Sequence, residues 1–398
     1  MSPAAAQTAA CTGGGRISKQ IAKQMVAAQD AMKARKWQEA LAKLRDAEAV
    51  PGAKSQFDLF HISEIKGYVY TNLKQDADAA RELEAGLNSP CMPEAKKLSH
   101  LRPLVGLYSA MRNYPKVIDY GNRALKISRD PDMQVQVAQA YYLSGNNKES
   151  VRVMNELLAS IEQRGSVPKE QQLQLIRAAC ERAQDNSCVT KVLEKLVVNY
   201  PKTEYWQHLM VALRNGDNND IQALNVMRLS AHVNVMKKPD EYKEMAQLAL
   251  DEKLAGEAQS ILEQAFAKKI FVETRDVQVN TRLLNTAKTK AAAEKAALAN
   301  SEAAAKAAST GDADVKVGAQ YLAFGDTAKA VEALQRGIQK GGIAKGDPNE
   351  AQKVDEAGIL LGIAQLKNNN KAEAAKAFRS VTRDPTMKRI ARLWLLNT

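Results

Sequence analysis

Histidines and cysteines are the side chains in this sequence best suited to metal binding or nucleophilic chemistry. The histidines are widely spread. No two lie four residues apart on one predicted helix or beside a cysteine, which are the spacings typical of zinc sites. We therefore expect each histidine to lie singly, at the surface or in a groove, and to bind no metal. The four are His61, His100, His208 and His232.

No other motif predicts catalysis. The turn Asp217–Asp220 resembles the start of a calcium loop, but the distal glutamate that would complete the coordination is missing. The run Gly13–Gly15 lacks the preceding strand and the lysine of a phosphate-binding loop. No serine or cysteine lies in a nucleophile elbow. The sequence therefore predicts a protein that is not an enzyme and uses no cofactor.

The four cysteines are candidates for disulfide bonds. Cys180 and Cys188 fall at the end of one predicted helix and the start of its partner. A hairpin can bring such positions to the Cα separation of a disulfide, about 4.4 to 6.8 Å. Two interpretations stay open: a bond, which would indicate an oxidising compartment, or two small core residues. Cys11 and Cys91 form a second candidate pair, whose distance nothing in the sequence fixes.

The elements that must position these side chains are helices. Aromatic residues make up only 5% of the 398 residues and charged residues 26%. Leu, Ala, Lys, Glu and Gln dominate, and these residues lose little rotamer freedom in a helix. The period-two alternation expected of strands is missing. The composition therefore favours an all-α chain.

A helix-hairpin pattern recurs along the chain. A first helix carries a small residue and an aromatic three positions later, and after a polar turn a second helix opens with a small residue. The clearest copy has Gly318 and Tyr321 in its first helix and Leu334 in its second. Most second helices open about 33 to 39 residues apart, a period typical of helical repeats. The opening positions are 40, 79, 117, 150, 189, 223, 258, 330 and 374.

Positions 258 and 330 are about two repeats apart, so we expect an irregular hairpin at residues 275–309. Stacked hairpins bury the apolar faces that a single hairpin cannot. The pattern thus predicts an all-α, right-handed solenoid of about ten hairpins over residues 17–398. Residues 1–16 are expected to be disordered, and residues 341–352 to form a Gly/Asp/Pro loop between the last two hairpins.

These repeats resemble tetratricopeptide repeats over residues 20–398. Some segments are also similar to a narrower group of secreted bacterial tetratricopeptide proteins, often encoded beside TonB, ExbB and ExbD components of TonB-dependent uptake. The resemblance implies a non-enzymatic interaction scaffold of the bacterial cell envelope, in the periplasm, with TonB-, ExbB- or ExbD-type partners. The segments are Leu196–Trp206, Gly337–Gly342, Gly358–Phe378 and Arg389–Leu395.

Residues 1–15 lack the apolar core of a signal peptide. This fits a mature exported chain whose signal is absent, and it fits a cytosolic tetratricopeptide adaptor equally well. No stretch approaches the roughly 20 apolar residues of a membrane span.

The net charge of +12 favours an anionic partner, but it is spread along the chain and not gathered in one block, which indicates a solvated, mildly basic surface instead. An anionic envelope polymer or glycan stays an alternative to a protein partner. Nucleic acid is not expected, because basic residues are not interleaved with aromatic ones.

The predicted binding site lies on the first helices, which line the concave face of such a solenoid. Amides there can bond a peptide backbone while tyrosines cover its side chains, so the partner would be a protein or an extended peptide. Tyr68 and Tyr142 have a second interpretation, packing between hairpins. The Lys/Asn set of a carboxylate clamp is not found. The predicted residues are His61, Glu64, Tyr68, Thr71, Asn72, Arg102, Gln139 and Tyr142.

Overall fold

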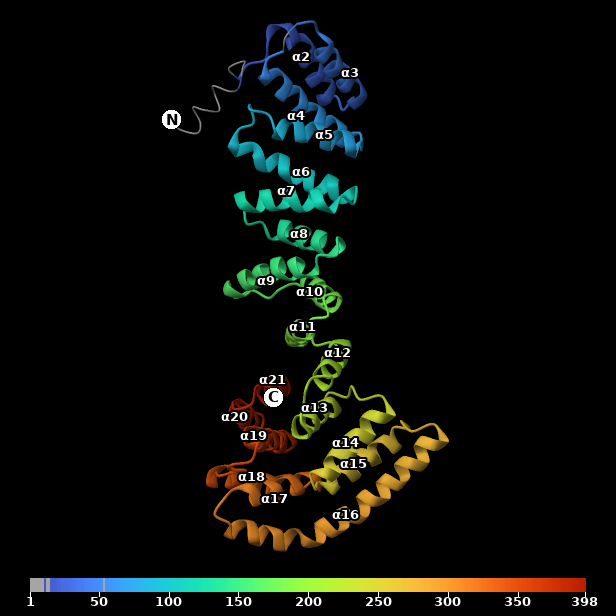
Figure 1. Ribbon diagram of the computed structural model, residues 1–398, viewed down its shortest axis with the longest axis vertical. Helices are drawn as coiled ribbons and strands as arrows, with labels where there is room; N and C mark the ends of the chain where they lie inside the picture. Colours follow the sequence, from blue (N-terminus) through green and yellow to red (C-terminus); the bar gives the residue numbers. More distant parts are fainter. Residues whose placement is uncertain (1–10, 12–14, 53) are drawn as a thin grey trace. The chain divides into compact units, whose positions relative to one another are not determined.

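The computed structural model describes the chain except for residues 1–10, 12–14 and 53. In the described part, helices are the only regular elements (Figure 1). None of these helices combines the length and the apolar character that a membrane span requires. The chain divides into two compact units, residues 1–185 (unit 1) and residues 186–398 (unit 2).

Unit 1 is a stack of helix hairpins. The two helices of a hairpin pack together, and the second helix packs against the first helix of the next hairpin (Figure 1). Its helices are α2 Lys19–Lys33, α3 Trp37–Ala49, α4 Gln56–Asn72, α5 Asp76–Leu87, η1 Glu94–Lys96, α6 Lys97–Ala110, α7 Tyr114–Ile127, α8 Pro131–Leu143, α9 Asn147–Gln163 and α10 Glu170–Arg182.

Unit 2 is also built of helix hairpins, and its C-terminal helices return to pack against α13 (Figure 1). Its helices are α11 Asn186–Asn199, α12 Thr203–Arg214, α13 Asp220–His232, α14 Pro239–Asp251, α15 Ala255–Ala267, α16 Thr274–Ala307, α17 Asp312–Ala323, α18 Thr327–Lys340, α19 Glu350–Lys367, α20 Lys371–Arg379, α21 Pro385–Trp394 and η2 Leu395–Asn397.

The predicted all-α solenoid of hairpins is confirmed. All nine positions expected to open second helices fall on the second helices α3, α5, α7, α9, α11, α13, α15, α18 and α20. Seven of the nine residues are fully buried. Val189 and Ala223 are half-buried instead, because the adjacent Thr190 and Leu224 take the core positions.

Close approach of the two helices explains the small residues of the pattern. Gly67 on α4 faces Leu83 on α5, and a Cβ added to Gly67 would lie only 3.1 Å from Cγ of Leu83. That distance is shorter than ordinary van der Waals contact. An alanine at position 67 would therefore require the Leu83 side chain to shift by a few tenths of an ångström.

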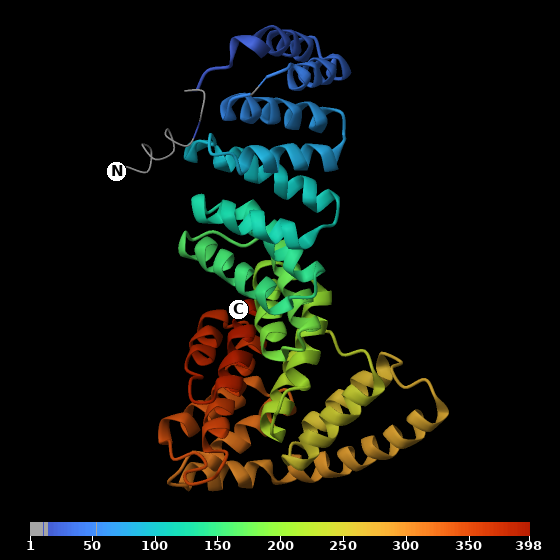
Figure 2. The same cartoon turned by 45° about the horizontal axis from the view of Figure 1, so that its top comes forward.

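The prediction of a hairpin at residues 275–309 is wrong. One unbroken helix, α16, spans Thr274–Ala307 (Figure 2). The segment contains neither glycine nor proline, and its alanine, lysine and glutamate residues favour continued helix over a turn. Its buried residues follow a heptad-like spacing and form one narrow seam, so a single helix replaces a hairpin here. They are Asn280, Ala287, Ala291, Leu298 and Ala305.

The expected loop at residues 341–352 is shorter than predicted, because α19 begins at Glu350. Gly341, Gly342 and Gly346 have φ angles of 66°, 64° and 80°, a region that L-residues rarely adopt. These glycines end α18 and let the chain turn toward α19. The expected disordered segment, residues 1–16, lies mostly outside the described residues.

Cys11 and Cys91 form a disulfide bond, with their Cα atoms 4.9 Å apart. The bond ties the chain before α2 to the connection between α5 and η1, across a sequence separation of 80 residues. In the chain-entropy model, closing a loop of this length stabilises the folded state by about 4 to 5 kcal/mol. The sequence alone left this pairing undecided.

Cys180 lies on α10 in unit 1, and Cys188 lies on α11 in unit 2. The bond between Cys180 and Cys188 stays a prediction.

A shared carboxylate joins two hairpins of unit 1. Glu84 on α5 accepts hydrogen bonds from Tyr108 Oη at 2.5 Å and from Tyr120 Oη at 2.6 Å. Lys116 Nζ donates to the same oxygen at 2.5 Å. Burial by itself would raise the pKa of Glu84, but the hydrogen bonds from Lys116, Tyr108 and Tyr120 outweigh it and lower the pKa below its ordinary value. The ionised carboxylate therefore stabilises the contact between α5, α6 and α7.

Replacing Glu84 with glutamine should destabilise the chain by about 1 to 2 kcal/mol at pH 7, since hydrogen bonds to a partly exposed charge are lost. The folded-state pKa is depressed, so this stability is present above the unfolded pKa and is lost as pH falls through the lower folded value. Urea unfolding from pH 7 to acid should show the two proteins converging. The Glu156→Gln variant, which alters an exposed ion pair, should show no such pH trend. A difference that persists in acid would contradict the role given to the charge.

Candidate functional site

Helix α4 carries five of the eight predicted binding residues. It begins with a capping box in which Ser55 and Asp58 bond each other's backbone N–H groups. Asp58 Oδ1 also accepts a hydrogen bond from the Ser18 backbone N–H at 2.9 Å, which fixes α4 against the start of α2. The five predicted residues recur at helical spacing between the buried positions. They are His61, Glu64, Tyr68, Thr71 and Asn72, and none of them is buried.

Tyr68 is the exposed aromatic residue of this helix. Its side chain is 54% exposed, although its ring meets the edge of Trp37 with centroids 5.9 Å apart. The neighbouring polar groups are engaged within the helix. Thr71 Oγ1 donates to the Gly67 carbonyl at 2.8 Å, and Asn72 Nδ2 donates to the Tyr68 carbonyl at 2.9 Å. Tyr68 therefore offers the main contact surface of this helix. The Thr71 and Asn72 donors are already used within α4 and are not free to bind a partner.

Glu64 connects α4 to the next hairpin. His61 Nδ1 lies 3.5 Å from Glu64 Oε2, and the imidazole stacks on Phe57 with centroids 5.9 Å apart. Lys96 Nζ, from the following hairpin, lies 3.4 Å from Glu64 Oε1. Burial would raise the pKa of Glu64, but the hydrogen bond from His61 and the charge of Lys96 lower it overall. The result is an ionised carboxylate held between two basic groups.

The predicted residues on α6 and α8 continue the same series of contacts. Arg102 on α6 pairs with Asp130, the N-cap of α8, at 2.8 Å. The Arg182 guanidinium of α10 lies 4.1 Å from the ring centre of Tyr142 on α8, so Tyr142 packs between hairpins. Gln139 is exposed and lines a small pocket of about 200 Å³.

These contacts link the first helices α4, α6, α8 and α10 in order. We call this surface the first-helix face, defined by His61, Glu64, Tyr68, Lys96, Arg102, Gln139 and Tyr142. Sequence reasoning missed the partners Trp37, Lys96, Asp130 and Arg182. Each partner comes from a different helix than the residue it contacts, so no local spacing could indicate it.

Helix α13 is the buried centre of unit 2. Its Asn225 and Arg228 are 0% and 6% exposed, which is unusual for such polar residues. The C-terminal helices reach α13 through side-chain hydrogen bonds. Gln222 Nε2 donates to Asp384 Oδ1, the N-cap of α21, at 3.0 Å. Asn225 Nδ2 donates to Glu356 Oε1 on α19 at 3.1 Å.

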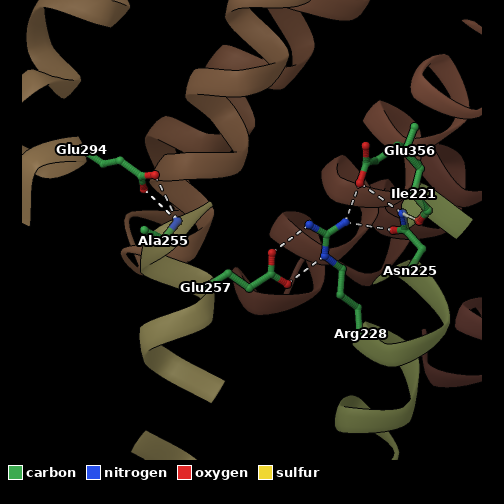
Figure 3. Close-up of polar contacts among 7 residues, drawn as sticks. All are labelled: Ile221, Asn225, Arg228, Ala255, Glu257, Glu294 and Glu356. Atoms are coloured by element: carbon green, nitrogen blue, oxygen red, sulfur yellow. Dashed lines mark hydrogen bonds and ion pairs between the residues drawn. The ribbon is translucent and has the colours of Figure 1, made fainter. Parts of the chain in front are cut away.

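Arg228 is the most buried cation of this contact (Figure 3). Its Nε and Nη2 atoms each donate to Glu257 on α15 at 2.8 Å, and its Nη1 donates to Glu356 at 2.6 Å. Burial would lower the pKa of Arg228, but the two carboxylates outweigh it and raise the pKa. Glu294 on α16 fixes α15 in place by accepting from the Ala255 backbone N–H at 3.0 Å (Figure 3).

A cavity of about 330 Å³ opens beside this network within unit 2. Its walls come from α13, α14, α15, α17, α19 and α21, which include the apolar Ile261, Leu322 and Ile363. His232 and Trp394 also line it, with ring centroids 4.5 Å apart. No local sequence pattern indicates this cavity, because its lining residues are spread from Arg228 to Trp394.

One of the four histidines, His100, is buried and not at the surface, whereas His232 is exposed. His100 is 5% exposed, and the pKa values of His100 and His232 are lowered, mainly by burial. Among the residues that the structure describes, no group of three or more histidine, cysteine or acidic side chains is placed to hold a metal ion.

Comparison with known proteins places the chain only by likeness of structure. No family model matches, and no curated protein matches. A tetratricopeptide repeat protein from Parabacteroides merdae is 12% identical, with 84% of this chain and 98% of that chain covered and a TM-score of 0.33. The C-terminal part of a tetratricopeptide repeat-containing protein from Cytophaga hutchinsonii is also 12% identical. The match covers 65% of this chain and 92% of that chain, with a TM-score of 0.35.

One chain in a structure of Naa15/Naa10 bound to HypK is 16% identical to this chain. The match covers 92% of this chain, with a TM-score of 0.30. The present chain spans only 63% of the length of that chain. At these TM-scores none of the likenesses bears on function.

Proposed function

We propose that this chain is a non-enzymatic scaffold that binds an extended segment of a partner protein along the first-helix face of unit 1. The observation that supports this best is the 54% exposure of Tyr68 beside Trp37, on a surface bordered by Glu64 and Arg102. A rigid, exposed aromatic ring with charged neighbours is typical of the residues that dominate protein interfaces.

The proposed compartment is the bacterial periplasm. The Cys11–Cys91 bond supports this, because disulfides persist in oxidising compartments and are rare in the cytosol. The resemblance of Leu196–Trp206 to secreted bacterial tetratricopeptide proteins supports a partner of the TonB, ExbB or ExbD type. A cytosolic adaptor is the alternative that a reduced Cys11–Cys91 pair in cells would favour.

An anionic envelope polymer or glycan is the second candidate partner. The net charge of +12 favours it, as do Lys96 and Arg102, whose side chains are 55% and 50% exposed on the first-helix face. This alternative predicts binding to the purified polymer that weakens steeply as salt increases.

Site-specific photo-crosslinking in intact cells tests the proposal. A photoreactive phenylalanine analogue at Tyr68 should capture a defined protein. The same analogue at Arg81, on the second helix α5 with a side chain 66% exposed, should not. In a pull-down with the captured partner, Tyr68→Ala should weaken binding about 30-fold, the size of a hot-spot residue.

Three outcomes separate the alternatives. Identical products from positions 68 and 81 would remove the first-helix face as the binding surface. Salt-sensitive binding of purified envelope polymer, with no protein captured, would favour the polymer. Thiol labelling of cell extracts should modify Cys11 and Cys91 only after reduction, and labelling without reduction would place the chain in the cytosol.

A further inference from the structure

One edge of unit 2 exposes an apolar side chain that the proposed scaffold function does not use. Val272 lies in the turn between α15 and α16 and is 81% exposed, more than any other large hydrophobic residue among those that the structure describes. Its neighbour Phe271 is only 6% exposed, and the Phe271 ring packs against that of Phe266 with centroids 5.0 Å apart. The turn is therefore anchored in the core, and Val272 is held outward from it.

A second turn lies beside the first. It connects α13 to α14 over residues 233–238, and Lys268 Nζ donates to Asn234 Oδ1 of this turn at 3.2 Å. Met236 fixes the second turn, because it is 4% exposed and its carbonyl accepts from Tyr242 Oη at 3.2 Å. Both turns lie on the same edge of unit 2 (Figure 2). The edge is therefore formed by two short, anchored segments.

Lysines surround Val272 on this edge. Lys268 and Lys269 precede it in the same turn, and Lys237 and Lys238 lie in the neighbouring turn. All four are exposed, and none of them forms an ion pair with a residue that the structure describes. We call this surface the Val272 edge, defined by Val272 and these four lysines.

The charge around the Val272 edge is positive. Glu273 is the one acidic residue of the two turns. The adjoining first turns of α14 and α16 add Asp240, and also Asp276 beside Arg275. Glu241 in α14 already has an arginine partner at 2.9 Å. The four lysines and Arg275 thus stand against three carboxylates without an ion pair, which leaves an excess of positive charge.

Lysine and valine together favour a lipid surface over a protein partner. Lysine is depleted in protein interfaces, and valine is under-represented among their hot-spot residues, which are enriched in Trp, Tyr and Arg. A bilayer surface stabilises both residue types. Lysines are attracted to anionic headgroups, and an exposed apolar side chain can enter the boundary between the headgroups and the acyl chains.

We propose that the Val272 edge binds the surface of an anionic lipid bilayer. The lysine ammonium groups would lie at the level of the lipid phosphates, and Val272 would enter the interface between them. The edge lies at one end of α16, a helix of 34 residues that extends about 50 Å away from it. No residue of the first-helix face takes part, so this proposal does not depend on the proposed scaffold function.

Cosedimentation of the full chain with lipid vesicles tests this proposal. Vesicles of phosphatidylglycerol and phosphatidylcholine at a ratio of roughly 3:7 should bind the chain, and vesicles of phosphatidylcholine alone should bind it at least about tenfold more weakly. Raising the salt concentration from about 0.05 M to about 0.5 M should release the chain, because the added ions screen the lysines.

Two pairs of lysine variants give a matched comparison. Lys268→Gln combined with Lys269→Gln should weaken binding about 25-fold, because each lysine near an anionic surface contributes about fivefold. Lys371→Gln combined with Lys388→Gln removes two exposed lysines of α20 and α21, and binding should change less than about twofold. All four side chains are exposed, so circular dichroism should show the same fold in both variants.

Val272 separates a bilayer from a soluble polyanion. Val272→Ser keeps the charge and should weaken vesicle binding about three- to tenfold, through loss of an inserted apolar group. In Val272→Trp, brominated lipids should quench tryptophan fluorescence beyond the quenching of the parent chain. Ile338→Trp is the control and should show no added quenching. Ile338 is 40% exposed on α18, whose end contacts the other end of α16 through a hydrogen bond from Lys340 Nζ to the Ala305 carbonyl at 2.6 Å.

Equal binding to the two kinds of vesicle would overturn the proposal. So would equal losses in the two lysine pairs, or equal quenching in Val272→Trp and Ile338→Trp. If the lysine variants weaken binding and Val272→Ser does not, the edge binds a soluble polyanion and not a bilayer.

Discussion

Replacing Arg228 with methionine should destabilise unit 2 by about 3 to 5 kcal/mol, because two largely buried carboxylates would lose their common cation. The Arg228 side chain is 5% exposed, and the side chains of Glu257 and Glu356 are 19% and 14% exposed. Methionine keeps much of the volume, so the loss reports the charge and not a cavity. Urea unfolding should show the change, and hydrogen exchange should locate it in α13, α15 and α19.

Arg152 provides the matched control. It also pairs with two glutamates, Glu149 and Glu156, but its side chain is 53% exposed. The Arg152→Met variant should therefore cost less than about 1 kcal/mol. If both variants cost the same, the burial of the Arg228 network has no energetic consequence. Replacing Arg228, Glu257 and Glu356 together with apolar residues should restore much of the stability, since no unpaired charge remains.

The second large effect is expected for Gly318→Ala. A Cβ on Gly318 would lie 2.6 Å from Cγ of Leu334 and 3.1 Å from the Leu334 backbone N. Cγ is the branch point of the leucine side chain and the backbone cannot move aside, so α17 and α18 would have to separate. Overpacking of this kind costs about 1 to 3 kcal/mol. Urea unfolding should show the loss, and hydrogen exchange of α17 and α18 should rise.

Gly106→Ala is the control for replacing a helical glycine that has no close neighbour. Gly106 lies within α6, is exposed, and has nothing within 4 Å of an added Cβ. Alanine there should stabilise the chain by up to about 1 kcal/mol, because a helix interior favours alanine over glycine. A stabilising Gly318→Ala variant would show that the close approach of α17 and α18 is not required.

The sequence predicted the features of the fold that depend on the spacing of nearby residues. The residues that open second helices, such as Ala40 and Ala330, are buried on the helices where the repeat placed them. Gly67 and Gly318 could be identified because the repeat sets them against a known position of the partner helix. The error at residues 275–309 has a physical reason too. The repeat spacing predicts a hairpin there, whereas a segment without a turn-forming glycine or proline continues as one helix.

The binding role of the predicted residues stays a prediction, and the structure shows only how each of these side chains lies. Helical periodicity placed His61, Glu64 and Tyr68 on one face of α4, but it could not distinguish an exposed ring from a packed one. The structure shows that Tyr68 is exposed while Arg182 lies over the ring of Tyr142. That difference depends on which side chain the next hairpin brings nearby, and the two residues look alike in the repeat pattern.

The sequence by itself thus determined the helical class, the repeat and the close helix pairs, because each follows from residues within one or two turns or one hairpin. Only the tertiary structure decided the environment of α13, the pairing of Cys11 with Cys91 and the cavity beside Trp394. Asn225 and Arg228 meet Glu356 across about 130 residues. Such contacts arise when α19 and α21 return to α13, and a pattern that repeats from one hairpin to the next carries no information about that return.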